Sequence, residues 1–293
     1  MNGRAVARGL LLDRLVGEPP ATAHPVAAFG SLMQQVEQRL YKPDLLAGAA
    51  YATFGVAVGA VVGRFTRTEV AVATAVAGRQ LREVAGHVRD ALVRDDVDHA
   101  RALIPSLVGR DPSVLDASGL AAATIESLAE NTVDAVVAPA FWALVGGAPG
   151  ALAYRAINTM DAMVGHRSER YARFGTAAAR LDDTANFVPA RLTAALVGCV
   201  RPRALPAIAR ALTTQARAHP SPNAGVAEAA FAAALDVELG GTLRYGERVE
   251  HRPLLGVGPR PEARDITTAI TLASHVELAL TAVCAACGPW RRR

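Results

Sequence analysis

The chain has 293 residues, of which 51% are hydrophobic and only 5% aromatic, and its net charge is +4. This charge comes almost wholly from arginine, because Lys42 is the only lysine. A Walker-type P-loop and a Schiff-base site both need a lysine in a setting that Lys42 does not have, so both are excluded. The arginines are scattered, few aromatics accompany them and no recognised nucleic-acid-binding motif is present, so we expect no nucleic-acid partner.

The first long apolar segment, Leu45 to Gly63, carries no charge. As a helix it would rise about 28 Å, close to the thickness of the hydrocarbon core of a bilayer. Arg64 and Arg67 then frame a short turn before the apolar run Val70 to Gly78. We therefore predict a helical hairpin that enters the membrane and returns.

Residues Arg79 to Ile104 place apolar side chains near helical spacing between arginines, which predicts one amphipathic helix at the cytosolic surface. The turn Val108 to Pro112 should end it. Ser118 is then the expected cap of the next helix.

The segment Ala135 to Tyr154 is also uncharged, but it contains Pro139 and the breaker Gly146 to Gly150. Arginine is dense on both sides of it, and the positive-inside rule places both flanks in the cytosol. We therefore predict a broken or re-entrant hairpin, covered at membrane depth by protein or a polar cavity.

Two further apolar runs follow, Leu192 to Val200 and Ile266 to Trp290, and the mixed segment Arg201 to Arg264 between them is expected in the cytosol. No linker divides residues 1–293, so we predict a single domain. The expected fold is all-α: a multi-pass integral membrane protein with re-entrant or broken helices and cytosolic amphipathic segments. The apolar run before Asp13 is too short for a signal peptide, which favours the cytoplasmic membrane.

Three polar clusters lie close to these apolar segments, where unpaired charges are costly. In the first, Glu126, Glu130 and Asp134 would share one helix face and repel one another unless a cation or arginines neutralise them. A solvated acidic stripe at a helix end is the alternative. In the second, Asn158 and Asp161 form a pair of possible oxygen ligands beside Arg155.

The third cluster holds Asp182, Asp183 and Asn186, which would direct oxygen ligands toward a common point on a helix. Such ligands suit a magnesium ion that carries substrate phosphates. The alternative is helix capping ahead of Pro189. Arg180 and Arg191 offer forked donors for phosphate or carboxylate groups.

His24 and His219 each precede a proline, which should hold the backbone extended and let each ring project from a fixed turn. Neither has a partner at zinc-like spacing, so a metal is not expected there. Asn223 and Gly225 complete a tight turn that is either structural or presents backbone N–H groups to an anion.

Together these motifs resemble the CobD/CbiB family of cobalamin biosynthesis, the adenosylcobinamide-phosphate synthases. The resemblance runs from Asp13 to about Gly258 and is carried by six motifs in the family's order: DRLVGEPPATAHPVAAFG, VGRD, ESLAENTVDAVVAP, YRAINTMDAMVG, RYARFGTAAARLDDTANFVPAR and HPSPNAG. The chain departs from the family at Glu18, where aspartate is frequent.

The resemblance implies an ATP-dependent ligase that joins adenosylcobyric acid, a corrinoid, to (R)-1-aminopropan-2-ol O-phosphate or a related amino-alcohol phosphate. The lipid bilayer would be a further partner, the active site would face the cytosol, and a homo-oligomer is left open. The expected catalytic residues are Glu126, Glu130, Asn131, Asp134, Asn158 and Asp161. The expected substrate and phosphate ligands are His24, Arg155, Arg180, Arg191, His219 and Asn223, and those for Mg²⁺ are Asp182, Asp183 and Asn186.

Two other functions compete with this one. A membrane regulatory protein of the AmpE type shares an ancestral pattern but should lack the complete DDxxN and HPSPNAG motifs. A small-solute transporter would line a pathway with its intramembrane charges, and it should have more long apolar spans and an internal repeat.

Overall fold

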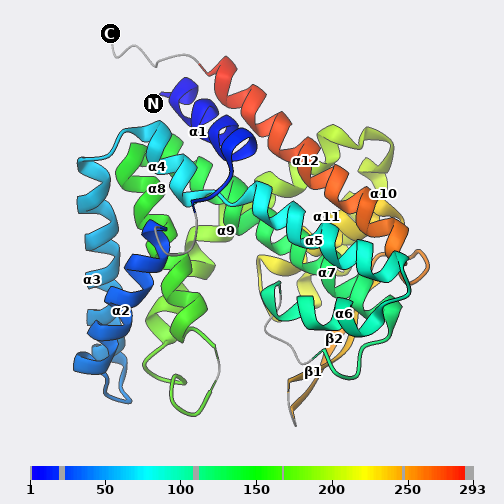
Figure 1. The fold of residues 1–293 in the computed structure, drawn as a ribbon, viewed down its shortest axis with the longest axis horizontal. Coiled ribbons are helices and arrows are strands. Elements are labelled where there is room, and N and C mark those ends of the chain that lie inside the picture. The colour runs from blue at the N-terminus through cyan, green and yellow to red at the C-terminus, as the bar shows by residue number, and fades with distance from the viewer. Residues whose placement is uncertain (1, 20–23, 108–111, 167, 246–247, 288–293) are drawn as a thin grey trace. The chain divides into compact units, whose positions relative to one another are not determined.

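The computed structural model describes residues 2–19, 24–107, 112–166, 168–245 and 248–287. Within these residues the chain is almost entirely helical, as Figure 1 shows, with one antiparallel pair of short strands. The all-α prediction is therefore confirmed. The strand pair lies in the segment that we expected to be mixed, and its sequence did not reveal it.

The helices are α1 (Gly3–Val16), α2 (Pro25–Leu40), α3 (Leu45–Arg64), α4 (Thr68–Ala75), α5 (Gly78–Val93), α6 (Val97–Leu103), α7 (Ala117–Thr132), α8 (Ala138–Val164), α9 (Thr176–Val200), α10 (Leu205–Thr214), α11 (Ala224–Leu235) and α12 (Ala263–Ala286). A π-helix, η3 (Val133–Val137), joins α7 to α8, and the strands are β1 (Leu239–Tyr245) and β2 (Arg248–Leu255). Short 3₁₀ turns lie at Ile104–Ser106, Pro202–Ala204 and Ala216–Ala218.

The chain forms two compact units. Unit 1 comprises Met1–Ala77, Asp134–Pro189 and Leu280–Arg293, and unit 2 comprises Gly78–Val133 and Ala190–Ala279. Each unit thus draws on segments that are far apart in the sequence. The single domain that we expected stays a prediction.

Unit 1 is built around α3 and α8, which lie side by side (Figure 1). The buried face of α3 repeats small residues every four positions, at Gly55, Gly59 and Gly63. A Cβ atom on Gly59 would stand 2.6 Å from the carbonyl oxygen of Leu152 on α8, so the two backbones approach as closely as glycine allows. Small-residue stripes of this kind are typical of helix pairs in membranes.

The apolar core of unit 1 lies at one end of this helix pair. Its fully buried members come from α2, α3, α8 and α9 and from the loop before α9: Met33, Tyr51, Ala52, Met160, Val164, Phe174 and Ala178. The core therefore ties together helices from two separate stretches of the chain.

Three helical stretches of the described residues are long and apolar enough to cross a membrane: Leu45–Arg64, Ala117–Val164 and Ala263–Ala286. A fourth crossing is added if α9 and the segment Pro202–Ala218, which meet at a bend of 112°, form one span. The apolar helix predicted from Leu45 is confirmed as one of these candidate spans. The returning arm is the eight-residue helix α4, which is too short to cross a bilayer.

The break that we expected between Ala135 and Tyr154 is present at Gly147. There the backbone takes φ 65° and ψ −151°, which interrupts α8. This region of conformational space is open almost only to glycine. The kink thus lies inside the GGAPG motif, as its sequence indicates.

Two local predictions are wrong. The amphipathic segment is two helices, α5 and α6, because Asp95 adopts a left-handed conformation with φ 58° and ends the first. The cap of α7 is Asp116, whose side chain accepts the N–H of Gly119, whereas the Ser118 hydroxyl donates to the Pro261 carbonyl. Of the turn predicted at Val108 to Pro112, residues 108–111 lie outside the described residues.

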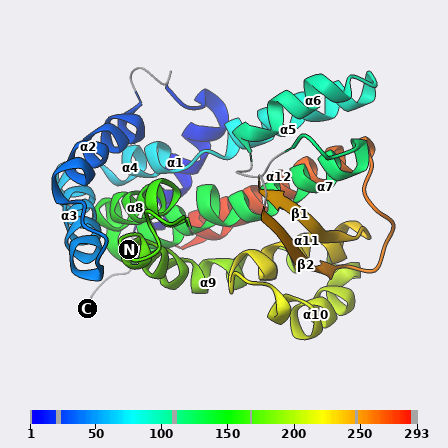
Figure 2. The ribbon, with the colours of Figure 1, turned by 90° about the horizontal axis from the view of Figure 1, so that it is seen from below.

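Unit 2 surrounds the alanine-rich helix α11, which packs against α7, α10 and the two strands (Figure 2). Eight of its residues are buried, including Glu228. A second buried carboxylate, Glu277 of α12, forms an ion pair with Arg82 of α5. Each carboxylate interrupts an apolar helix, and ion pairing offsets the cost of burying its charge.

Candidate functional site

Five polar side chains meet inside unit 1, and we call them the carboxylate–amide cluster: Asp134, Tyr154, Asn158, Asp182 and Asn186. Asp134 lies in the π-helix, a distortion that is frequent at functional sites. Tyr154 and Asn158 are one turn apart on α8, and Asp182 and Asn186 are one turn apart on α9. The cluster therefore draws on all three polar motifs of the sequence.

The Asn158 amide connects the two carboxylates of the cluster by hydrogen bonds, and the Asn186 amide connects Asp182 to Tyr154. The Asn158 Nδ2 atom lies 3.2 Å from Asp134 Oδ2 and 3.4 Å from Asp182 Oδ1. Asn186 Nδ2 donates to Asp182 Oδ2 at 3.0 Å, and its Oδ1 accepts from the Tyr154 hydroxyl at 2.8 Å. Since each amide nitrogen faces a carboxylate, only one orientation of each amide satisfies these contacts.

Arg155 supplies a positive charge next to the cluster. Its Nη1 lies 3.4 Å from the Oδ1 atom of Asn158, and its charge also acts on Glu18 and His24. Burial raises the pKa of the Glu18 carboxyl, an effect that Arg155 opposes and Asp13 reinforces. Burial also lowers the pKa of His24, and the charge of Arg155 lowers it further.

His24 caps α2 from the extended conformation that its proline predicts, with φ −79° and ψ 123°. Its Nδ1 accepts the N–H of Val26 at 3.1 Å, which leaves the proton on Nε2, 3.7 Å from Glu18 Oε2. Two buried donors, His24 Nε2 and Arg155 Nε, have no hydrogen-bond partner within the described part of the chain. A bound anion or water would satisfy them.

Magnesium fits the cluster only together with a phosphate ligand. Among the described residues, no group of three or more His, Cys, Asp or Glu side chains could hold a metal ion. Mg²⁺ does not need such a group, because it is commonly held by one or two carboxylates, waters and substrate phosphates. Asp134 and Asp182 supply the two carboxylates.

The three predicted Mg²⁺ ligands, Asp182, Asp183 and Asn186, lie in different surroundings. Asp182 and Asn186 face each other inside α9, so the alternative that they cap a helix is wrong. Asn186 uses its oxygen for Tyr154, and Asp183 is exposed. The structure thus groups Asp182 with Asp134 rather than with its neighbour in sequence.

A second group of polar residues lies in unit 2, around a cavity of about 410 Å³. Its polar walls are Arg191, Arg217 and His219, and the remaining lining is Leu212, Ala216, Pro220, Pro222 and Val226. The Arg191 guanidinium donates to the Asn223 side chain at 2.8 Å and to the Pro222 carbonyl at 3.0 Å, which fixes its position. We call this space the Arg191 pocket.

His219 repeats the geometry of His24. Its backbone is extended, with φ −73° and ψ 139°, and Nδ1 accepts the Ser221 N–H at 3.1 Å. Its Nε2 lies 3.7 Å from Glu228 Oε2, and Arg252 Nη1 lies 3.9 Å from the other oxygen of Glu228. A histidine before proline therefore faces a glutamate in each unit.

The remaining predicted site residues differ in their burial and in their hydrogen bonds. Glu126 is buried and accepts the Gly240 N–H at 2.8 Å, so it is not part of a solvated stripe. Glu130 and Arg180 are exposed, and Asp161 is half-buried. Asn131 donates to the carbonyl and hydroxyl of Ser127 on its own helix.

The predicted one-face array of Glu126, Glu130 and Asp134 crosses a change from α-helix to π-helix. The first two belong to unit 2, and Asp134 belongs to unit 1. The π-helix also starts at Val133, so the regular spacing that the prediction used ends before Asp134.

Sequence reasoning missed four polar residues of these groups: Tyr154, Arg217, Glu228 and Arg252. Tyr154 opens the YRAINTMDAMVG motif one turn before Asn158, and that spacing was a usable signal. Glu228 is the only charged residue in the apolar run of α11, which marks it as paired. No local pattern distinguishes Arg217 or Arg252 from the other arginines.

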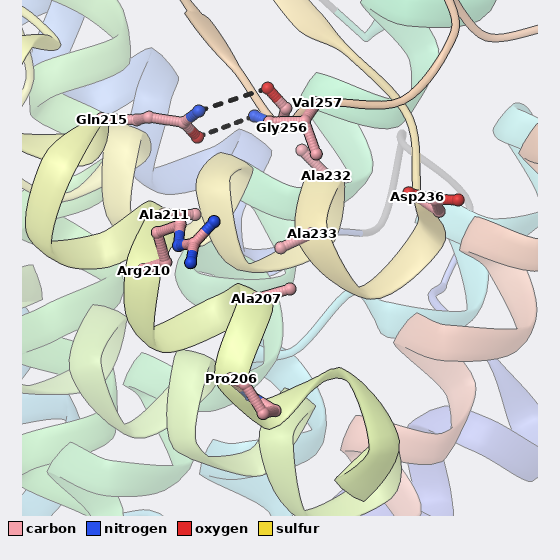
Figure 3. A pocket seen from close by; sticks show the side chains of 10 residues that line it. All are labelled: Pro206, Ala207, Arg210, Ala211, Gln215, Ala232, Ala233, Asp236, Gly256 and Val257. Atoms are coloured by element: carbon pink, nitrogen blue, oxygen red, sulfur yellow. Dashed lines mark hydrogen bonds between the residues drawn. The ribbon is translucent and has the colours of Figure 1, made fainter.

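A further cavity of unit 2, about 280 Å³ in volume, lies between α10 and α11 (Figure 3). Figure 3 shows Gln215 closing one end of it by a pair of hydrogen bonds to Gly256, at 2.8 and 3.2 Å. Arg210 and Asp236 are its charged residues, and alanines form most of the rest. None of the site residues predicted from the sequence lines this cavity.

Comparison with known proteins places this chain among relatives of similar length. The model of the CobD/Cbib protein family matches residues 6–273. A protein named cobalamin biosynthesis protein CobD from Mycobacterium tuberculosis H37Rv is 47% identical, over 97% of this chain and 95% of its own. Proteins of the same name from Chromobacterium violaceum and Brucella suis are 45% and 40% identical, each over at least 90% of both chains.

No solved structure gives a significant match. The family match covers most of both units, and it includes every residue of the carboxylate–amide cluster and of the Arg191 pocket. This chain therefore belongs to the CobD/CbiB family.

Proposed function

We propose that the protein is an enzyme of cobalamin biosynthesis, an adenosylcobinamide-phosphate synthase. It would join the carboxylate of adenosylcobyric acid to the amine of (R)-1-aminopropan-2-ol O-phosphate as ATP is hydrolysed. The observation that carries this proposal is the 47% identity to a cobalamin biosynthesis protein over nearly the whole chain. The AmpE-like regulator and the transporter have no comparable support.

The chemistry requires activation of a poor electrophile. A carboxylate oxygen of the corrinoid attacks the γ-phosphorus of ATP, which releases ADP and forms an acyl phosphate. The amine then attacks the acyl carbon, loses a proton and displaces inorganic phosphate. Phosphoryl transfer depends mostly on positioning and charge neutralisation, so no lysine or nucleophile of the protein is needed.

The carboxylate–amide cluster suits the nucleotide phosphates. Asp134 and Asp182 would hold Mg²⁺ beside the phosphates, and the ion would neutralise charge that develops on them. Asn158 and Asn186 keep the two carboxylates oriented through the hydrogen bonds described above. The buried donors Arg155 Nε and His24 Nε2 would bind a phosphate or carboxylate oxygen.

The Arg191 pocket suits the amino-alcohol phosphate. Its volume of about 410 Å³ matches a small organic phosphate and is far too small for a corrinoid. Arg191 and Arg217 supply the charge that a phosphate needs, and the leucine, valine and prolines of its wall would accept the carbon chain. Asn223 acts indirectly in this arrangement, because it positions Arg191.

The test is turnover by the full-length protein purified in detergent. Adenosylcobyric acid, the amino-alcohol phosphate, ATP and Mg²⁺ are supplied, and the amide product and ADP are measured. We expect Asp182→Asn and Asp134→Asn to lower kcat by at least about 100-fold, since each removes a charge at the reacting phosphates. Glu169→Gln, which removes an exposed carboxylate of unit 1, is the matched control.

Three outcomes would count against the proposal. Amide formation that persists at the normal rate in Asp182→Asn would remove the metal assignment. No turnover of these substrates combined with specific solute uptake into vesicles would favour the transporter. No turnover, no uptake and an effect on gene regulation would favour the regulator.

We further propose that the enzyme works in the cytoplasmic membrane and that its site opens to the cytosol. Single cysteines at the exposed positions Val16, Arg170 and Ala218, in a background without the three native cysteines, would report this by labelling in intact cells. Labelling of any of them by an impermeant reagent applied from outside would overturn this orientation.

A further inference from the structure

A basic cavity of about 780 Å³ lies in unit 1 where α2 ends and α3 begins. Its cations are Arg39 at the end of α2, Lys42 in the connecting loop and Arg173 in the segment before α9. They come from three parts of unit 1 and line one concave surface. Lys42 is the only lysine of the chain.

The charge of this cavity is not neutralised by its surroundings. None of the three cations makes a hydrogen bond or ion pair with any side chain that the structure describes, and all three are exposed. The one acidic lining residue is Asp44, whose Oδ1 accepts the Ala47 N–H at 2.8 Å as the cap of α3. The cavity therefore carries a net charge of about +2 at neutral pH.

Contacts between the α2–α3 connection and the segment before α9 hold this geometry in place. Arg170 stacks on the ring of Tyr41, 4.0 Å from its centroid, and the Tyr41 hydroxyl donates to the Arg170 carbonyl at 3.0 Å. The Tyr41 ring also lies 5.3 Å from the ring of Phe174, which is fully buried. Lys42 and Arg173, the neighbours of these anchored residues, are thus kept close together.

The rim of the cavity is apolar and exposed. Leu45 and Leu46 open the candidate span α3 and are 50% and 83% exposed, and Leu40 at the end of α2 is 40% exposed. In a protein that crosses a membrane, the first turn of a span lies at the level of the lipid headgroups. The leucines then meet acyl chains, and the cations meet the headgroup region.

We propose that this cavity binds the phosphate of an anionic phospholipid headgroup. Arg39, Lys42 and Arg173 contact the phosphate, and the acyl chains lie along Leu40, Leu45 and Leu46. A soluble phosphate would use the cations but leave the leucines exposed to water. Basic cavities next to membrane helices are suited to such headgroups. This site is independent of the proposed ligase activity.

Lipid titration of the full-length protein in neutral detergent tests the proposal. We expect dioctanoyl phosphatidylglycerol to bind saturably and dioctanoyl phosphatidylcholine to bind at least about tenfold more weakly. Each cation removed should weaken phosphatidylglycerol about fivefold, so the triple variant Arg39→Gln/Lys42→Gln/Arg173→Gln should lose about a hundredfold.

The matched control removes the same charge elsewhere. Arg4→Gln/Arg64→Gln/Arg203→Gln replaces three exposed arginines outside the cavity and should change the affinity less than about twofold. Lys42→Arg, which keeps the charge, should bind like the parent protein. Should the triple variant fail to fold, the single variants Arg39→Gln and Arg173→Gln decide, with about fivefold loss expected from each.

Several results would overturn the assignment. An equal loss in the two triple variants would mean that overall charge, and not the cavity, attracts the lipid. Unchanged affinity in both single variants would exclude the cavity. If inorganic phosphate binds with the expected dependence on the variants while phosphatidylglycerol binds no better than phosphatidylcholine, the cavity serves a soluble anion.

Discussion

Replacement of Tyr154 by phenylalanine tests whether the carboxylate–amide cluster is held together as the structure indicates. The side chain is 1% exposed, and its hydroxyl donates at 2.8 Å to Asn186, which is itself 2% exposed. The variant keeps the ring but strands a buried amide oxygen. Stranding a buried acceptor costs about 1–3 kcal/mol, and hydrogen bonds between membrane helices reach at most about 1.7 kcal/mol. We therefore expect a loss of about 1.5 kcal/mol.

The control is Tyr41→Phe. The Tyr41 hydroxyl donates to the Arg170 carbonyl, but this bond is exposed to solvent, so water replaces it and the loss should stay below about 0.5 kcal/mol. Stability is measured by chemical unfolding in mixed detergent micelles. Because Tyr154 and Asn186 share one hydrogen bond, the loss in the double variant Tyr154→Phe/Asn186→Leu should be smaller than the sum of the losses in the two single variants, even though Asn186→Leu also removes the donor to Asp182.

The same variant should also affect turnover, because Asn186 holds Asp182 through a 3.0 Å hydrogen bond. We expect kcat to fall about tenfold, since small displacements of a catalytic group are costly. Two results would refute this reasoning: equal losses of stability in Tyr154→Phe and Tyr41→Phe, or strictly additive losses in the double variant.

Three other variants test separate features. His24→Asn keeps a side chain that can cap α2 but removes the titrating ring. Because folding lowers the pKa of His24, the unfolded chain binds the proton more readily. Acidification from pH 7.5 to 5.5 should therefore lower the apparent melting temperature of the parent protein more than that of the variant. Gly59→Ala puts a Cβ atom 2.6 Å from a carbonyl of α8 and should cost about 1–3 kcal/mol in chemical unfolding, and no loss would mean that α3 and α8 are not in close contact. Arg191→Lys loses the forked contact with Asn223 and Pro222, so KM for the amino-alcohol phosphate should rise about tenfold while KM for ATP stays constant; a rise in both would remove the pocket assignment.

The apolar helices were predictable because the sequence features that start, end or break them are local. The uncharged run from Leu45 to Gly63 became α3, which begins directly after its cap Asp44. The glycines and proline of GGAPG indicated the break found at Gly147. By contrast, the division of Arg79–Ile104 at Asp95 had no clear signal, because a left-handed aspartate leaves the helical spacing on both sides intact.

The sequence identified many residues of the candidate site, but it did not show which of them lie together in space. Asp134, Asn158 and Asp182 belong to three segments, and only the packing of α8 and α9 brings them together. Spacing along one helix favoured the array with Glu126 and the pair with Asp183, because sequence patterns report neighbours on one element. Tyr154 was missed for a different reason: its spacing to Asn158 placed it on the same helix face, but a tyrosine at that position can equally fill space in the core.

The alternation of the chain between the two units limits the order in which they can fold during translation. It passes between units at four points, and three of them, after Val133, Pro189 and Ala279, lie inside continuous helical stretches. No cut at a loop would release either unit as one uninterrupted fragment. Unit 1 also takes residues from the end of α12, so on the ribosome it cannot be completed until residue 280 and those beyond it have been added. Unit 1 therefore stays incomplete until all of unit 2 has been translated.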